Sequence, residues 1–120
     1  IVQALRNEPL TVYGDGGQTR SFCYYTDLLM GLKLLMESEK TFDSPINLGN
    51  PEEFTMLQLA KLIIDLTDSK SLLQFQPLPS DDPKQRKPSI KKAFEELEWS
   101  PRINLEEGLK LTIRDLEARI

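Results

Sequence analysis

Histidine is absent from the 120-residue chain, and cysteine occurs once, at Cys23. The commonest general base and the commonest neutral metal ligand are therefore missing, and no Ser-His-Asp or Cys-His catalytic set can form. A single cysteine cannot make an internal disulfide, which is compatible with a reducing compartment. We expect no metal site from this composition.

Positive charge and long apolar runs are also scarce. Fifteen lysine and arginine residues stand against nineteen acidic ones, so the formal net charge is −4, which argues against nucleic acid or an anionic membrane as the main partner. The apolar runs are short and interrupted, as in LIIDL, and none is long enough to span a bilayer. The composition, 39% apolar and 28% charged, is typical of one small globular domain.

Periodicity predicts a small α/β fold with short strands and about four helices, too few elements for a nucleotide-binding Rossmann sheet. The opening IVQALRN has the pattern of the last turns of a helix whose beginning is missing, with no initiator Met or targeting segment before it. We therefore expect a piece of a longer protein. Strands are predicted at LTVY, RSFCYY, INL and LLQFQPL, and helices after the N-cap candidates Thr26, Thr55 (with Gln58 completing a capping box) and Ser89, and over 105–120.

The stretch GDGGQTR, residues 14–20, is rich in glycine but fails as a dinucleotide fingerprint. That motif needs G-x-G-x-x-G between a strand and a helix, whereas here the spacing differs and a second predicted strand follows. We interpret the glycines as a hairpin turn. Arg20, just after the turn, is either a surface or salt-bridge residue or a ligand-binding one, and its position alone leaves both open.

Five of the nine residues in KQRKPSIKK, 84–92, are basic, although the chain is acidic. The run is either a solvated face or an anion site at a helix start, where Arg86 offers a planar guanidinium to a phosphate or carboxylate. Tyr13, Tyr24 and Tyr25 either stack on a ring or pack in the core. The adjacent carboxylates of the DDP sequence, 81–83, have no third ligand at a suitable spacing, so we interpret them as solvated loop.

Together, PLTVYGDGGQTRSFCYYTDLLMGL, INLGNPEEFTMLQLA, DDPKQRKPSIKKA and LEWSPRINLEEGL resemble the C-terminal region of the extended short-chain dehydrogenase/reductase enzymes. Within that family the likeness is closest to the UDP-glucuronic acid decarboxylases. It extends over nearly the whole chain, with the motifs in the same order. NLGNPEE and DDPKQRKP favour the decarboxylases over the related epimerases and dehydratases, which remain the alternative, as does a non-catalytic module that binds nucleotide sugars.

The resemblance implies a two-domain enzyme of which residues 1–120 are the C-terminal substrate-binding domain. NAD and a Tyr-x-x-x-Lys pair would belong to an N-terminal Rossmann domain that this chain lacks, so the chain alone is expected to be inactive. In such enzymes NAD oxidises C4 of the sugar, carbon dioxide leaves, and the ketone is reduced again. The implied partner is a UDP-sugar, with no nucleic acid. A homodimer is expected for the full-length enzyme, and the cytoplasm is the expected compartment, with the Golgi lumen as the alternative.

The resemblance also assigns the binding residues. Thr11 and Tyr13 lie in the strand that is similar to the one lining the uracil pocket, and Arg20 matches the arginine that reaches the diphosphate. Arg86 matches an arginine that contacts the phosphates and is implicated in catalysis near the sugar. Ser89 stands where many relatives have an aspartate that contacts the ribose; its hydroxyl can still form a hydrogen bond to a ribose.

Overall fold

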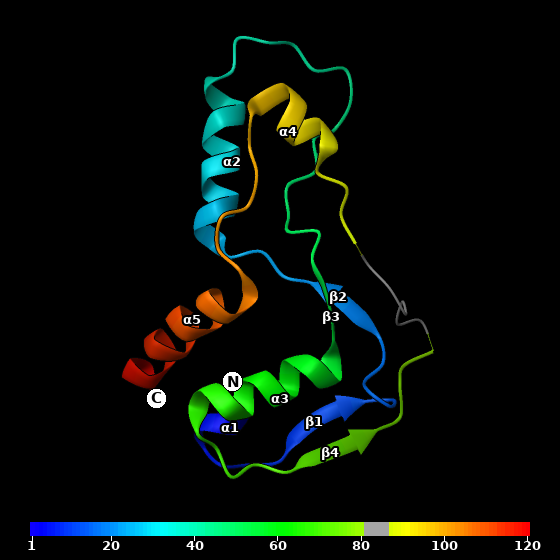
Figure 1. The fold of residues 1–120 in the computed structure, drawn as a ribbon, viewed down its shortest axis with the longest axis vertical. Helices are drawn as coiled ribbons and strands as arrows, with labels where there is room; N and C mark the ends of the chain where they lie inside the picture. The colour runs from blue at the N-terminus through cyan, green and yellow to red at the C-terminus, as the bar shows by residue number, and fades with distance from the viewer. Residues whose placement is uncertain (81–86) are drawn as a thin grey trace. The chain divides into compact units, whose positions relative to one another are not determined.

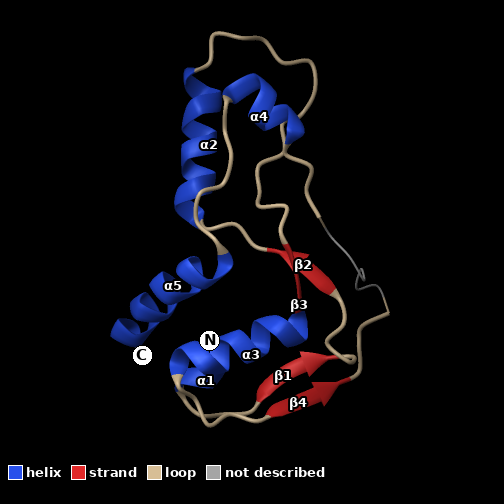
Figure 2. Cartoon of the chain, in the orientation of Figure 1, coloured by secondary structure: helices blue, strands red, loops and turns tan. Residues whose placement is uncertain are grey.

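The computed structural model describes residues 1–80 and 87–120 and confirms a small α/β fold with short strands (Figures 1 and 2). Its elements divide between two compact units, each described below by itself. The first unit comprises the described residues of Ile1–Arg20, Phe54–Arg86 and Glu106–Ile120, and the second comprises Ser21–Glu53 and Lys87–Leu105. In chain order the elements are α1 (Val2–Leu5), β1 (Leu10–Tyr13), β2 (Thr19–Ser21), α2 (Tyr25–Glu37), β3 (Glu53–Thr55), α3 (Met56–Thr67), β4 (Leu73–Gln76), α4 (Lys91–Leu97) and α5 (Leu105–Arg119).

The first unit is built on the parallel pair β1–β4, in which Leu10 lies opposite Leu73 and Tyr13 opposite Gln76. Successive residues of a strand point to opposite faces, and in β1 the buried positions are Leu10 and Val12. They form one hydrophobic core with Ala4 of α1 and with α3. Thr11 and Tyr13 alternate with them and are exposed.

Helix α3 begins as the sequence predicts. The Thr55 hydroxyl accepts the Gln58 main-chain N–H at 3.0 Å, and the Gln58 side chain accepts the Thr55 N–H at 2.8 Å. This reciprocal pair satisfies two N–H groups that a helix start otherwise leaves without partners. Ala60 and Ile63 form the buried side of the helix against the core, which confirms the predicted apolar stripe.

Two predictions about strands are wrong. β1 and β2 form no hairpin, because β1 pairs with β4 and β2 pairs with β3. The segment INL, 46–48, is not a strand in the described structure. An apolar β-prone segment becomes a strand only where another strand pairs with it, and the pattern of one segment does not reveal its partner.

Two predicted caps are also wrong. Helix α2 begins at Tyr25 with Tyr24 as its N-cap, so Thr26 lies inside the helix, although Asp27 is in the first turn as predicted. Helix α4 begins at Lys91 with Ile90 as its N-cap, and neither helix has a side-chain cap hydrogen bond. Serine and threonine satisfy the cap pattern wherever they precede a helix, but the backbone conformation decides which residue takes that position.

In the second unit, helix α2 packs against α4 and against Trp99, which is 2% exposed. Gly31 makes this possible, because a Cβ there would lie 2.8 Å from Leu48 Cδ1 and 3.1 Å from Trp99 Nε1. The predicted apolar stripe of α2 is largely uncovered in the structure, with Leu29 56% and Met36 80% exposed. No helix in the described ranges has both the length and the apolar character that crossing a membrane requires.

Candidate functional site

A hollow of about 190 Å³ in the first unit lies along β1, between α1 and α3. Two of the predicted binding residues, Thr11 and Tyr13, line it together. Other side chains that line it come from α1, from the turn after β1 and from α3, and include Gln3, Gln18, Met56 and Leu59. The hollow therefore combines an apolar wall with two side-chain amides and one edge of a strand.

The two edges of β1 have different hydrogen-bond partners. On the edge that faces β4, Leu10 and Gly14 donate their N–H groups to the main-chain carbonyls of Leu72 and Gln76. Thr11 and Tyr13 therefore direct their main-chain groups to the opposite edge, beside the hollow. There the Thr11 N–H donates to Gln3 Oε1 at 3.3 Å, and the Tyr13 carbonyl accepts Gln18 Nε2 at 3.1 Å.

Within the described residues, no hydrogen bond is assigned to the two groups between these bonds, the Thr11 carbonyl and the Tyr13 N–H. They offer one acceptor and one donor at the edge of the hollow.

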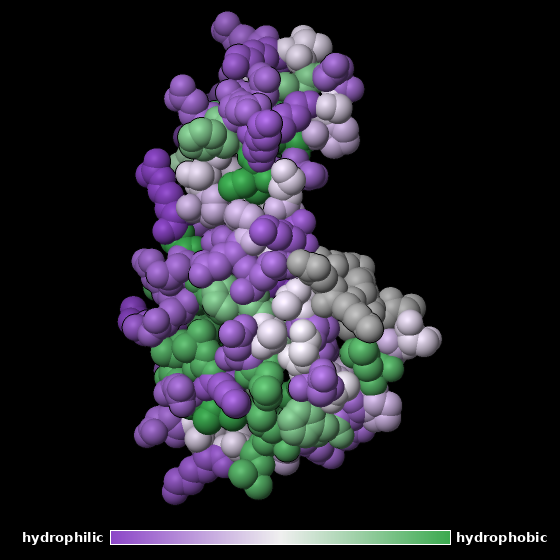
Figure 3. All heavy atoms as spheres, turned by 45° about the vertical axis from the view of Figure 1, so that its right-hand side comes forward, coloured by the Kyte–Doolittle hydropathy of each residue, from purple (hydrophilic) through white to green (hydrophobic). Residues whose placement is uncertain are grey.

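The Tyr13 ring is 49% exposed, which removes the core-packing interpretation for this tyrosine. Apolar side chains gather over the surface around the β1–β4 pair, where Leu72 and Phe75 are also exposed (Figure 3). The other two tyrosines contact each other, with the ring centroids of Tyr24 and Tyr25 4.8 Å apart. Tyr13 is thus the tyrosine that lines the hollow beside β1.

The glycine stretch is a turn, as predicted, although not a hairpin. Gly14 and Gly16 have positive φ angles of 63° and 77°, a conformation that glycine adopts without steric cost. A Cβ on Gly16 would lie 3.0 Å from both Leu57 Cβ and Val12 Cγ1. The turn needs glycine there because it passes directly over the start of α3.

Main-chain carbonyls of the same turn accept the first N–H groups of α3. Met56 donates to the Gln18 carbonyl and Leu57 to the Gly16 carbonyl, each at 3.0 Å. Free N–H groups at a helix start are what a phosphate loop presents to its ligand, and here they already have protein partners. The turn therefore has a structural role and is not a phosphate loop.

The remaining predicted residues are distributed as follows. Arg20 lies in β2, half-buried, and its Nη1 donates to the Thr19 carbonyl at 2.7 Å. Ser89 is exposed, belongs to the second unit and precedes α4. Arg86 lies outside the described residues. The structure thus brings Thr11 and Tyr13 into one hollow, places Arg20 in the same unit, and leaves the roles of all five residues as predictions.

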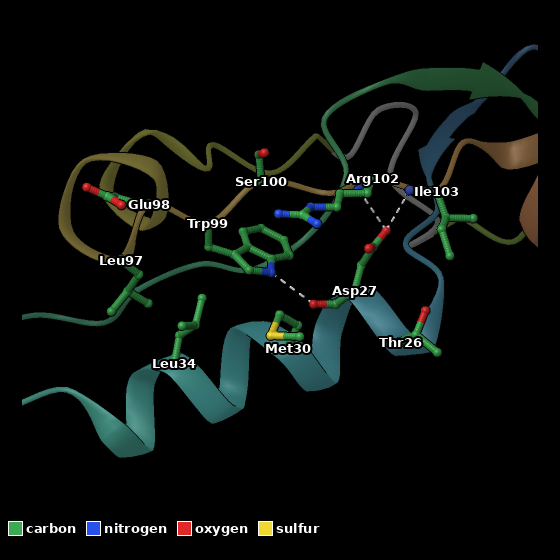
Figure 4. A pocket seen from close by; sticks show the side chains of 10 residues that line it. All are labelled: Thr26, Asp27, Met30, Leu34, Leu97, Glu98, Trp99, Ser100, Arg102 and Ile103. Carbon is green, nitrogen blue, oxygen red and sulfur yellow. Dashed lines mark hydrogen bonds between the residues drawn. The ribbon is translucent and has the colours of Figure 1, made fainter.

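A second hollow of about 530 Å³ lies in the second unit beside α2, lined by Asp27, Met30, Trp99 and Arg102 among others (Figure 4). Asp27 is 7% exposed, and its Oδ2 accepts the main-chain N–H groups of Arg102 and Ile103 at 3.1 and 3.0 Å. The polar groups of this hollow therefore hold the segment after α4 against α2. Sequence reasoning missed this network, because a first-turn aspartate has a sufficient local explanation in the helix dipole.

Cys23 is half-buried, and its thiol lies 3.6 Å from the Tyr24 carbonyl. Burial raises the pKa of this thiol above its ordinary value, and the negative charge of Asp27 raises it further. The thiolate is the nucleophilic form of cysteine, and a raised pKa makes it rarer. The surroundings of Cys23 therefore do not activate its thiol as a nucleophile.

Comparison with known proteins relates the whole chain to one group of enzymes, although no protein-family model matches it. The chain is 52% identical over all 120 residues to UDP-glucuronic acid decarboxylase 2 of Arabidopsis thaliana. It is 54% identical over 114 residues, 95% of its length, to UDP-glucuronic acid decarboxylase 1 of Danio rerio. The match covers 26% and 27% of these relatives, so the chain spans about a quarter of their length.

Among solved structures, 98% of the chain superposes on 38% of the UDP-glucuronic acid 4-epimerase from Bacillus cereus in complex with UDP-glucuronic acid and NAD. The TM-score is 0.92 and the sequence identity is 29%. These similarities confirm the resemblance drawn from the sequence motifs, both to the decarboxylases and to the C-terminal region of the extended short-chain dehydrogenase/reductase fold.

Proposed function

We propose that residues 1–120 are the C-terminal, UDP-sugar-binding domain of a longer NAD-dependent enzyme that converts UDP-glucuronate to UDP-xylose and carbon dioxide. The observation that carries this proposal is the 52% identity to a UDP-glucuronic acid decarboxylase across the entire chain. The full-length protein is proposed to be a homodimer in the cytoplasm.

The hollow beside β1 supports a role in binding the base. Uracil presents an imide, with one N–H donor between two carbonyl acceptors. The Thr11 carbonyl and the Tyr13 N–H are neighbouring groups on one strand edge and complement such a donor–acceptor pair. The exposed Tyr13 ring and the apolar wall from α3 offer contact surface for a flat heterocycle.

Arg20 and Arg86 are proposed to bind the diphosphate, since a guanidinium forms charge-assisted hydrogen bonds to phosphate oxygens. Arg86 is further proposed to act near the reacting sugar. Ser89 is proposed to contact the ribose through its hydroxyl. For Arg20, the hydrogen bond from Nη1 to the Thr19 carbonyl fixes one side of the guanidinium on its own strand.

NAD does not fit the described residues of this chain. The glycine turn leads from β1 into β2, and the N–H groups at the start of α3 are engaged by that turn, so neither presents a pyrophosphate site. The proposed cofactor site therefore belongs to another part of the longer protein. The chain by itself is proposed to bind and orient the substrate without catalysing its conversion.

The alternative is a UDP-sugar 4-epimerase, favoured by the structural likeness to the Bacillus cereus enzyme. The identity of 29% to that enzyme is well below the 52% to the decarboxylase, and we therefore favour decarboxylation. The test is to incubate the full-length protein with NAD and UDP-glucuronate and to follow the sugar by NMR. UDP-xylose with one equivalent of carbon dioxide is the expected result, whereas the C4 epimer of UDP-glucuronate would establish the alternative.

A further inference from the structure

Gln18 is a buried polar residue, only 8% exposed, that the motif analysis did not single out. A side-chain amide out of water needs hydrogen-bond partners, because leaving one unpaired is costly. Gln18 Nε2 donates to the Tyr13 carbonyl at 3.1 Å, and the amide lines the hollow beside β1. Its burial is thus associated with one specific contact on the strand proposed to bind the base.

The main chain of Gln18 is fixed as well. Its carbonyl accepts the Met56 N–H at 3.0 Å, at the first residue of α3. Gln18 therefore joins β1 through its side chain to α3 through its backbone. Two residues later the chain reaches Arg20 in β2, the residue proposed to reach the diphosphate.

We propose that Gln18 is a positioning residue, which holds the base-binding edge of β1 at Tyr13 at a fixed position relative to Arg20 in β2. This inference rests on the proposed binding of a UDP-sugar. A nucleoside diphosphate that contacts both points requires their separation to be fixed before it binds, and preorganisation of this kind reduces the entropy that binding must offset. Gln18 contacts neither part of the ligand in this account and acts through Tyr13.

The test uses the full-length protein and the variant Gln18→Leu, which keeps the bulk and removes the amide donor. The Tyr13 carbonyl still accepts the Gly16 N–H at 3.3 Å, so β1 and the turn remain connected and the variant is expected to fold. Calorimetry should show UDP affinity reduced about fivefold to tenfold, the range for one lost hydrogen bond. Affinity for inorganic diphosphate, which needs only the arginines, should change less than twofold.

Gln58→Leu is the matched control. It makes the same Gln-to-Leu substitution in the first turn of α3, removes the capping contact to the Thr55 N–H, and leaves β1 untouched. This control should lower the melting temperature while UDP affinity stays within twofold of the wild type. A purely structural role for Gln18 predicts the same pattern for Gln18→Leu.

The outcomes distinguish the positioning role of Gln18 from the proposed binding of a UDP-sugar. If the wild-type protein binds UDP and Gln18→Leu binds it equally well, or loses affinity for UDP and diphosphate in parallel, the positioning role is wrong and the proposed function stands. If the wild-type protein binds no UDP, both are wrong. Should Gln18→Leu fail to fold, Gln18→Asn keeps the amide on a shorter stem, and the same UDP-specific loss is expected.

Discussion

The indole Nε1–H of Trp99 donates to the main-chain carbonyl of Asp27 at 2.9 Å, across 72 positions of the sequence. Both residues are buried, and the carboxylate of the same Asp27 accepts two more N–H groups from Arg102 and Ile103 (Figure 4). One residue in the first turn of α2 therefore anchors the chain between α4 and α5 at three points. We expect the stability of the second unit to depend on it.

Asp27→Ala should lower the free energy of unfolding by about 2–4 kcal/mol, since it leaves two N–H groups without their charged acceptor. Trp99→Phe should lower the free energy of unfolding by less. It loses about 1 kcal/mol for the hydrogen bond, and a further amount because the phenyl ring fills less space. Urea unfolding measures both, and Asp65→Ala, at an exposed position of α3, is the control. Equal effects of Asp27→Ala and Asp65→Ala would show that the network contributes little.

Truncating an apolar side chain should reduce the stability of the protein more in α3 than in α2. Ile63 in α3 is 7% exposed, so Ile63→Ala should destabilise the protein by about 2–4 kcal/mol. Leu29 in α2 is 56% exposed, and Leu29→Ala in the 120-residue chain should cost less than about 1 kcal/mol. Chemical denaturation of the two variants compares them directly, and a larger loss for Leu29→Ala would contradict the burial described for α2.

These two helices show how far the sequence predicts the fold. Both have an apolar periodicity in the sequence, which is stronger in α3, and both helices are found where it predicts them. Burial of the stripe is a different property, because it depends on what packs against the helix. In the described residues α4 and Trp99 pack against α2, yet Leu29 and Met36 remain exposed. Periodicity predicts the element and its apolar face, whereas tertiary contacts decide how much of that face is covered.

The candidate site shows the same division. Thr11 and Tyr13 were identifiable because they lie in a recognisable strand within a family motif, and the structure places both in one hollow. Gln18 was not identifiable, since its importance comes from burial and from one hydrogen bond to the Tyr13 carbonyl. A polar residue in a glycine-rich turn is expected to be solvated, whereas the tertiary fold buries this one between β1 and the start of α3.

Gly16→Ala should destabilise the first unit by about 1–3 kcal/mol, because the φ of 77° is strained for alanine and the new Cβ would contact Leu57 and Val12 at 3.0 Å. Gly17→Ala is the matched control. Its backbone is not in the left-handed region, and the three atoms nearest to its Cβ would belong to the exposed Asp15 side chain. Moving that carboxylate costs at most the hydrogen bond that its Oδ1 accepts from the Gly17 N–H at 2.8 Å. Thermal unfolding should rank the two variants in this order, and the reverse order would refute the account of the turn.

The proposed binding of one diphosphate by both Arg20 and Arg86 predicts that the effects of replacing them are coupled. In the full-length protein, Arg20→Ala and Arg86→Ala should each weaken UDP binding by about 1.5–3 kcal/mol, the range for a charge-assisted hydrogen bond. Because both side chains are proposed to contact one diphosphate, the double variant should deviate from the sum of the single losses. Arg86→Ala should also lower kcat more than Arg20→Ala. Near-zero, additive effects in calorimetry would identify both arginines as ordinary surface charges.

Cys23 should react slowly with iodoacetamide in the folded protein. Its pKa is raised by burial and by Asp27, so at any given pH near neutrality the thiolate fraction is lower than in the unfolded chain. The pH at which alkylation becomes half-maximal should therefore be higher in buffer than in concentrated urea, measured by mass spectrometry on the same protein. A midpoint at or below that of the unfolded chain would contradict the burial of this thiol.

The path of the chain between its two units has a consequence for biosynthesis. The chain passes from one unit to the other four times, and Leu109 of α5 packs on a core that contains Ala4, against which Ile1 also packs. A core that joins such distant positions closes late, because the long loop must be ordered before its contacts form. On the ribosome, the first unit therefore cannot complete this core until α5 has left the exit tunnel.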